Sequence, residues 1–143
     1  MAPILTNTEA EAWLQGFYDM ADKLEAVPWF EQYSTEDTEI QYANLPLMTG
    51  KDALNMYIKV FGNLDRLAHS VKHFDVVGDR ILHAVTVRYV VKGDDPDKDV
   101  IEIGAFSECH LRRDEVDGKV KCARADIYVD PSPVFQRVAA KGL

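Results

Sequence analysis

After residue 68 the chain changes from a helical to a strand pattern, and this change limits the fold more than any other feature. Four segments alternate apolar and polar residues with a period of two: 70–77, 80–92, 100–113 and 120–129. Gly78-Asp79, between the first two, is typical of a two-residue type II′ hairpin turn. Long alternating strands joined by short loops predict an antiparallel meander.

The first part of the chain has helical periodicity instead. Thr8 and Glu11 have the spacing of a capping box, and four apolar residues follow at steps of three or four: Trp13, Phe17, Ala21 and Leu24. Residues 27–30 predict a second short helix or turn, and residues 38–42 a strand. Gly50 precedes a third helix with its apolar residues on one side.

This order of elements predicts an α+β fold in one domain spanning residues 1–143. The N-terminal helices would cover a curved antiparallel sheet, giving a cone-shaped, cystatin-like α+β barrel. A cavity is expected between the two layers. The segment 130–133, with two prolines, is expected to end the last strand before a short tail.

Composition excludes several classes of partner. Sixteen basic against 24 acidic residues give a net charge of −8, which argues against a protein that follows nucleic-acid phosphates. No apolar run approaches the ~20 residues of a membrane span, so no membrane partner is expected. Two cysteines and a start without a basic, apolar leader favour a reducing, cytoplasmic setting.

The turn that follows the first predicted strand carries two polar side chains. Tyr42 and Asn44 are two residues apart, so on a continuous strand they share a face. A phenol and a carboxamide that converge could orient a water or a substrate oxygen. In the alternative interpretation, Asn44 only satisfies backbone groups of the turn before Pro46.

Pairing across the Gly78-Asp79 turn predicts which histidine lies inside. Phe74 would face His83 on an apolar surface, where a neutral imidazole could exchange a proton, unless it is simply a core histidine bonded to backbone. His69 and His73 are ~13 Å apart on one strand, so they do not form a metal site. Both are expected on the outer face, although a bulge would bring His69 into the cavity.

The remaining candidates are wall residues of the cavity and groups on the outer face. We expect substrate contacts from Trp13, Phe17, Trp29, Phe61, Tyr89, Ile103, Ser107, Cys109 and Ile127. Cys109 and Cys122 are expected on neighbouring strands with their side chains on opposite faces of the sheet, so a disulfide is not expected. Asp126 is expected on a charged outer face with Arg124 and Tyr128, unless a bulge turns it inward.

Two stretches resemble the SnoaL-like branch of the nuclear transport factor 2-like superfamily. Tyr42-Ala-Asn44-Leu-Pro46 is similar to the turn of limonene-1,2-epoxide hydrolase in which a Tyr and an Asn hold the attacking water. The ending Tyr128-Val-Asp130 before proline is common in fungal SnoaL-like proteins of secondary metabolism, which include cyclases, dehydratases and isomerases. The resemblance implies the cone fold and a homodimer through the outer sheet face.

The chain departs from the hydrolase in its charged set. The hydrolase's inward Asp-Arg-Asp residues fall on Ile127, Val85 and Val87, none of which transfers a proton. We therefore expect a small enzyme without cofactor or metal that isomerises, cyclises or dehydrates an apolar polyketide- or terpenoid-type intermediate. His83, His69, Tyr42 and Asn44 are its candidate catalytic residues. The alternative is a non-catalytic module for small-molecule binding or dimerisation.

Overall fold

The computed structural model describes residues 2–143, which form helices at both ends of the chain and one sheet between them. The elements are α1 (Asn7–Ala21), α2 (Ala26–Tyr33), β1 (Ser34–Tyr42), β2 (Met48–Thr49), α3 (Gly50–Gly62), β3 (Leu64–Val77), β4 (Arg80–Val91), β5 (Ile101–Arg113), β6 (Val120–Tyr128) and α4 (Ser132–Ala140). None of the described helices is long and apolar enough to cross a membrane.

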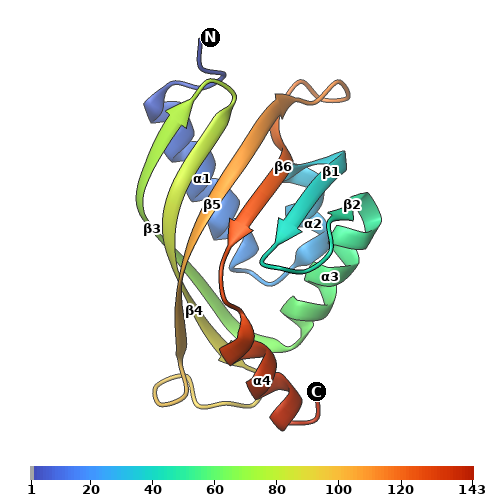
Figure 1. Cartoon of the computed structure of the whole chain (residues 1–143), viewed down its shortest axis with the longest axis vertical. Helices are drawn as coiled ribbons and strands as arrows, with labels where there is room; N and C mark the ends of the chain where they lie inside the picture. Colours follow the sequence, from blue (N-terminus) through green and yellow to red (C-terminus); the bar gives the residue numbers. More distant parts are fainter. Residues whose placement is uncertain (1) are drawn as a thin grey trace.

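The six strands form one open, curved sheet with the order β2-β1-β6-β5-β4-β3. Helices α1, α2 and α3 lie on one side of it, as Figure 1 shows. The meander β3-β4-β5-β6 is antiparallel as expected, but β1 pairs with β6 in parallel, so the sheet is mixed. The α+β architecture predicted from the periodicity is confirmed, and the fully antiparallel sheet is not.

The turn at Gly78-Asp79 has the predicted length and backbone. Val77 pairs with Arg80 across the turn. Of the two turn residues, only Gly78 has a positive φ, +62°, as a type II′ turn requires at its first central residue. Phe74 faces His83, also as predicted.

A bulge in β3 reverses the predicted register beyond that point. Val71 pairs with Val85 and His73 with Ala84, so Lys72 is an extra residue between them. The register predicted from the Gly78-Asp79 turn continues from the Phe74–His83 pair to Lys72 with Val85 and Ser70 with Val87; both of these pairs are wrong, and His69 pairs with Val87 instead. Because Val87 faces the inside, the bulge brings His69 to the inner face.

A second register shift lies where β5 meets β6. His110 pairs with Arg124 and Leu111 with Cys122, which leaves Ala123 as the extra residue. Cys122 therefore faces inward like Cys109, and the prediction that the two thiols point to different faces is wrong. Both cysteines are free and buried.

The ends of two helices differ from the sequence expectations. Helix α1 is capped two residues earlier than predicted, because Thr6 and Glu9, not Thr8 and Glu11, form the reciprocal capping box. The expected tail after Pro131 is instead helix α4. A proline in the first turn of a helix has no N–H to lose there, so Pro133 does not prevent this helix.

Candidate active site

The inner face of the sheet and the three N-terminal helices enclose an apolar cavity of about 90 Å³. Aromatic side chains of α1, α2 and α3 form one wall, and β3 to β6 form the other. Trp29 is the centre of the aromatic wall, with ring centroids 5.3 Å from Phe17, 4.9 Å from Tyr57 and 5.5 Å from Phe61. Eight of the predicted site residues border this cavity: Phe17, Trp29, Tyr42, Phe61, His69, Tyr89, Ser107 and Ile127.

The wall of the cavity includes a histidine that is held by a carboxylate. The Nδ1 atom of His69 lies 2.6 Å from Oδ1 of Asp22, and the His69 backbone N–H donates to Oδ2 at 3.0 Å. Since an ionised carboxylate only accepts hydrogen bonds, Asp22 selects the tautomer with its proton on Nδ1. The Nε2 atom of His69 is then the basic nitrogen of the ring.

Tyr18 links this pair to a second histidine behind it. Its ring stacks on His69 with centroids 4.3 Å apart, and its hydroxyl lies 2.6 Å from Nε2 of His83. Burial raises the pKa of Tyr18 well above its usual value and lowers that of His83 to about 4. Both groups are therefore neutral at pH 7.

His83 does not border the cavity, although the sequence made it a candidate catalytic residue. Its side chain is fully buried behind Tyr18, and its Nδ1 atom has no hydrogen-bond partner. His83 contacts Tyr18, which borders the cavity, and does not border the cavity itself. His69, expected on the outer face unless a bulge intervened, occupies the position at the cavity instead.

The structure separates Tyr42 from Asn44. Ala43 between them has a φ of +50°, which ends the strand alternation, so Tyr42 faces the cavity and Asn44 is exposed in a shallow hollow beside Tyr128. Burial raises the pKa of Tyr42, and contact with Tyr89 opposes that shift. A positive φ is uncommon for alanine, which is why the sequence gives no warning of this turn.

Three other predicted wall residues lie elsewhere. Trp13 packs on Phe17 outside the cavity, and its indole N–H donates to the Val120 carbonyl at 2.9 Å. Ile103 is part of the buried core. Cys109 borders only a narrow space of about 30 Å³.

The sequence interpretation missed Tyr18 and Asp22, which lie on α1 and at its C-terminal cap. They are four residues apart and therefore on one helix face, a signal available in the sequence. The interpretation followed the apolar residues of this helix alone. The partner His69 is 47 residues away from Asp22, and no local pattern connects them.

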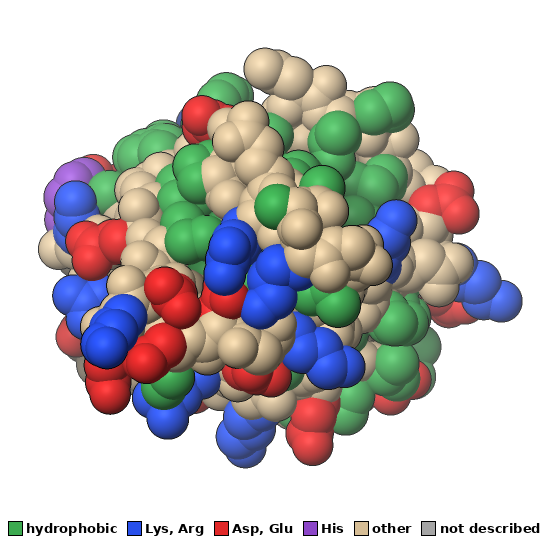
Figure 2. Space-filling model, turned by 90° about the horizontal axis from the view of Figure 1, so that it is seen from below, with side chains coloured by type: hydrophobic (Ala, Val, Ile, Leu, Met, Phe, Trp, Pro, Cys, Tyr) green, Lys and Arg blue, Asp and Glu red, His purple; other side chains and the backbone are tan. Residues whose placement is uncertain are grey.

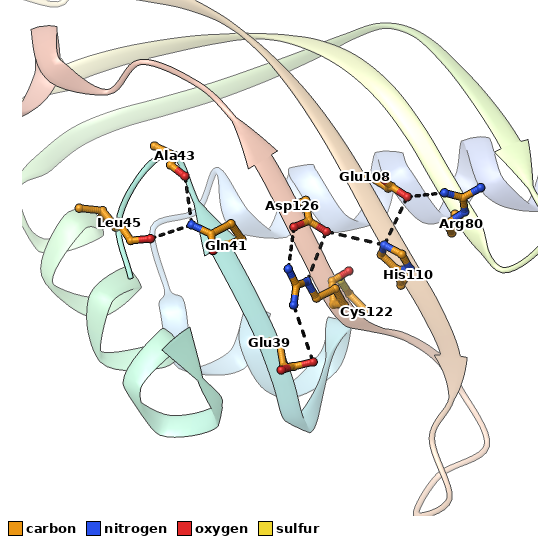
Figure 3. Close-up of polar contacts among 10 residues, drawn as sticks. Glu39, Gln41, Ala43, Leu45, Arg80, Glu108, His110, Cys122 and Asp126 are labelled. Atoms are coloured by element: carbon orange, nitrogen blue, oxygen red, sulfur yellow. Dashed lines mark hydrogen bonds and ion pairs between the residues drawn. The ribbon is translucent and has the colours of Figure 1, made fainter. Parts of the chain in front are cut away.

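A different polar cluster lies on the opposite, outer face of the sheet (Figure 3). Ligand atoms of Glu108, His110 and Asp126 all lie within 4.8 Å of one another, a spacing that a metal ion could bridge. Arginines already neutralise both carboxylates, because Arg80 lies 2.6 Å from Glu108 and Arg124 lies 2.9 Å from Asp126. A cation would have to displace them, so we assign no metal to this cluster. Asp126 faces outward, as the sequence register predicts.

The cavity is suited to proton transfer on an apolar ligand. It combines a histidine oriented by a carboxylate, a neutral phenol and the buried hydroxyl of Ser107. The indole N–H of Trp29, another residue that borders the cavity, is buried without a hydrogen-bond partner. Val85, Val87 and Ile127, on which the resemblance to the hydrolase was expected to place its charged residues, all border the cavity.

Comparisons of the sequence with protein-family models and with curated proteins find no match. Solved structures with this fold are numerous. A protein from Jannaschia sp. assigned as a SnoaL-like polyketide cyclase aligns with a TM-score of 0.69 and 14% identity, over 97% of this chain and 99% of that one. One from Novosphingobium aromaticivorans assigned as a scytalone dehydratase gives 0.66 and 17%, over 85% and 81%.

An M. tuberculosis epoxide hydrolase of the limonene-epoxide-hydrolase-like type aligns with a TM-score of 0.67 and 11% identity, over 93% of this chain and 91% of that one. At such identities the likeness concerns the fold, and reactions of these proteins do not transfer with it. The sequence-based recognition of the fold is thus confirmed. The chain shares the fold of these SnoaL-like, dehydratase-like and epoxide-hydrolase-like proteins.

Proposed function

We propose that the protein is a small enzyme that moves a proton within an apolar, ring-containing substrate, by isomerisation, cyclisation or dehydration. The observation that carries this proposal is the Asp22–His69 pair at the wall of an otherwise apolar cavity. Structural neighbours assigned as a polyketide cyclase and a dehydratase make the same reaction class plausible on this fold.

In the proposed reaction, His69 is the general base and later the acid. Its Nε2 atom takes a proton from a carbon next to a carbonyl, while Asp22 stabilises the imidazolium that forms. The same nitrogen then returns the proton, either to another carbon in an isomerisation or to a departing hydroxyl in a dehydration. In the isomerisation only the proton changes place, and in the dehydration the C–O bond breaks and the hydroxyl leaves as water. Neither reaction transfers electrons to or from the substrate, so the chemistry requires no redox cofactor.

Tyr18 would hold the substrate oxygen on which negative charge develops. Because Nδ1 of His83 has no acceptor, the tautomer with the proton on Nε2 leaves no buried N–H unpaired. In that tautomer His83 donates to the Tyr18 oxygen, and the phenol hydrogen can donate to a ligand in place of the neighbouring Ser107 hydroxyl. His83 is then a positioning residue, and Tyr18 is a catalytic one. Tyr42 would serve at the far end of the cavity.

The alternative is a non-catalytic binding module, as the sequence also allowed. The cavity favours it in one respect, because no carboxylate borders the space itself and Asp22 acts only through His69. The two hypotheses differ in what the loss of the His69 imidazole does. Binding tolerates a glutamine there, and proton abstraction does not.

Elimination of 5-nitrobenzisoxazole separates these hypotheses without knowledge of the natural substrate. A base removes the C3 proton, the N–O bond breaks, and a coloured phenolate forms. We expect catalysis by the wild-type protein and a loss of about 100-fold in kcat/KM in His69→Gln. His73→Gln is the matched control, because His73 is exposed on the same strand. Equal rates in the two variants would favour the binding module.

We also propose a homodimer in a reducing, cytoplasmic setting. The outer sheet face supports the dimer, because Phe106 and Tyr128 pair across β5 and β6 and are 39% and 64% exposed. The Arg80–Glu108 and Arg124–Asp126 ion pairs on the same face offer charges of both signs. Such a mixed surface suits a two-fold interface in which each copy offers the same surface. The neighbouring, unbridged thiols of Cys109 and Cys122 support the reducing setting.

A further inference from the structure

A second apolar space lies between helices α3 and α4, at the end of the molecule where the chain terminates. It measures about 320 Å³, and its walls are mostly aliphatic and aromatic: Val60 of α3, Val134, Phe135 and Val138 of α4, and Leu143. Phe135 and Leu143 are 37% and 50% exposed. Figure 2 views the molecule from this end and shows hydrophobic side chains reaching the surface beside Lys and Arg.

This groove adjoins the cavity of the candidate active site. Met56 and Val60 of α3 border both spaces. Methionine has three rotatable bonds and adapts to what it packs against, so Met56 is a movable part of the partition. A ligand that continues from the cavity into the groove would pass over Met56 and Val60.

The sizes of the two spaces make this continuation necessary for most substrates. Pockets that bind drug-sized molecules measure roughly 300–1,000 Å³. The cavity alone, at about 90 Å³, falls well below this range, whereas the groove adds about 320 Å³. A polycyclic or terpenoid-type molecule therefore cannot be held by the cavity alone.

The cavity carries most of the polar groups of the combined space. It is bordered by His69, Ser107 and the phenols of Tyr18, Tyr42 and Tyr89, whereas the groove offers only Lys59 and Asn63 among apolar residues. Helix α4 is fixed in place, because Val134 is buried and Asp94 binds both Arg137 and Lys141 at 2.6 Å. The groove is therefore a formed feature of the fold.

We propose that the groove between α3 and α4 binds an apolar arm of the substrate. The substrate class is then an elongated molecule with an oxygen-bearing ring at the His69 end and an alkyl, prenyl or aryl arm over Met56 and Val60. This inference rests on the proposed function for the placement of the polar group, and the groove specifies what lies beyond it.

A series of 4-alkylphenols from methyl to hexyl, titrated by calorimetry, tests the groove. The affinity for the wild-type protein should rise about fourfold for each methylene, which corresponds to ~0.8 kcal/mol of apolar burial. In Ala139→Trp the indole should fill the groove, because Ala139 borders it. In this variant the affinity should stop increasing after the shortest alkyl chains, while the affinity for 4-methylphenol should stay within twofold of that of the wild-type protein.

Ala140→Trp is the matched control, since this neighbouring residue is exposed and does not border the groove. It should keep the wild-type rise with chain length. The proposal is overturned if no member of the series binds, if affinity does not change with chain length, or if Ala139→Trp keeps the full rise. Turnover lost in His69→Gln with the rise intact supports both proposals, and unchanged turnover with the rise intact overturns only the catalytic one.

Discussion

Asp22 lies at the C-terminal cap of α1, where a carboxylate is disfavoured by the helix. The C-terminal end of a helix carries partial negative charge, so an acidic side chain there costs stability. Both oxygens of Asp22 bind His69. The presence of a carboxylate at this position is therefore explained by its contacts with the histidine and not by the helix. Groups placed against local preference are often functional, and this one orients the proposed base.

At the same scale, the buried His83 makes stability depend on pH. Its folded pKa of about 4 is below the ordinary value of 6.5, so the unfolded chain takes up the proton first as the pH falls. Stability is therefore full above pH 6.5 and is lost towards pH 4, by about 3 kcal/mol for this group.

Urea unfolding of the wild-type protein and of His83→Gln at pH 7 and pH 4.5 measures this effect. The wild-type protein should lose more free energy of unfolding on acidification than the variant does. The difference removes contributions from carboxylates that both proteins share. An equal loss in the two proteins would show that His83 is protonated without cost in the folded state.

At the scale of elements, helix α4 depends on one carboxylate. The Asp94 side chain is 2% exposed and accepts hydrogen bonds from Arg137 and Lys141, which hold its pKa far below the usual range. Because the folded pKa is depressed, this contribution is present at neutral pH and declines in acid.

Replacing Asp94 with Asn should loosen α4 without unfolding the sheet. Hydrogen exchange of residues 132–141 should become faster, and that of β4 and β5 should stay unchanged. Glu102→Gln is the control, because the Arg88–Glu102 pair is exposed and contributes little. Unchanged exchange in α4 would mean that Val134 alone holds the helix.

Strands β3 and β6 show which parts of the site can be predicted from the sequence and which cannot. Periodicity gave the meander, the Gly78-Asp79 turn and the pairing of Phe74 with His83, because these depend on local patterns. The bulges at Lys72 and Ala123 insert one ordinary residue each and carry no sequence signature. Each reverses the side chains beyond it, so His69 and Cys122 were assigned to the wrong faces.

At the scale of the whole molecule, the outer sheet face should join two copies. Light scattering should give a mass about twice that of the 16.1 kDa chain. Phe106→Lys combined with Tyr128→Lys should give the monomer, because the four lysines would face one another across the two-fold axis. Val116→Lys, in a loop where Val116 is 90% exposed, should remain dimeric. A monomeric wild-type protein would exclude the interface.

The most direct test of the central claim is the protonation state of the His69 ring, read from long-range ¹H–¹⁵N NMR spectra at pH 8. We expect the proton on Nδ1, a shift of the Nε2 signal when 4-methylphenol is added, and no response at His73. Asp22→Asn should mix the two tautomers. A proton on Nε2 in the wild-type protein, or an Nε2 signal that ignores a bound phenol, would contradict the role of His69 as the base.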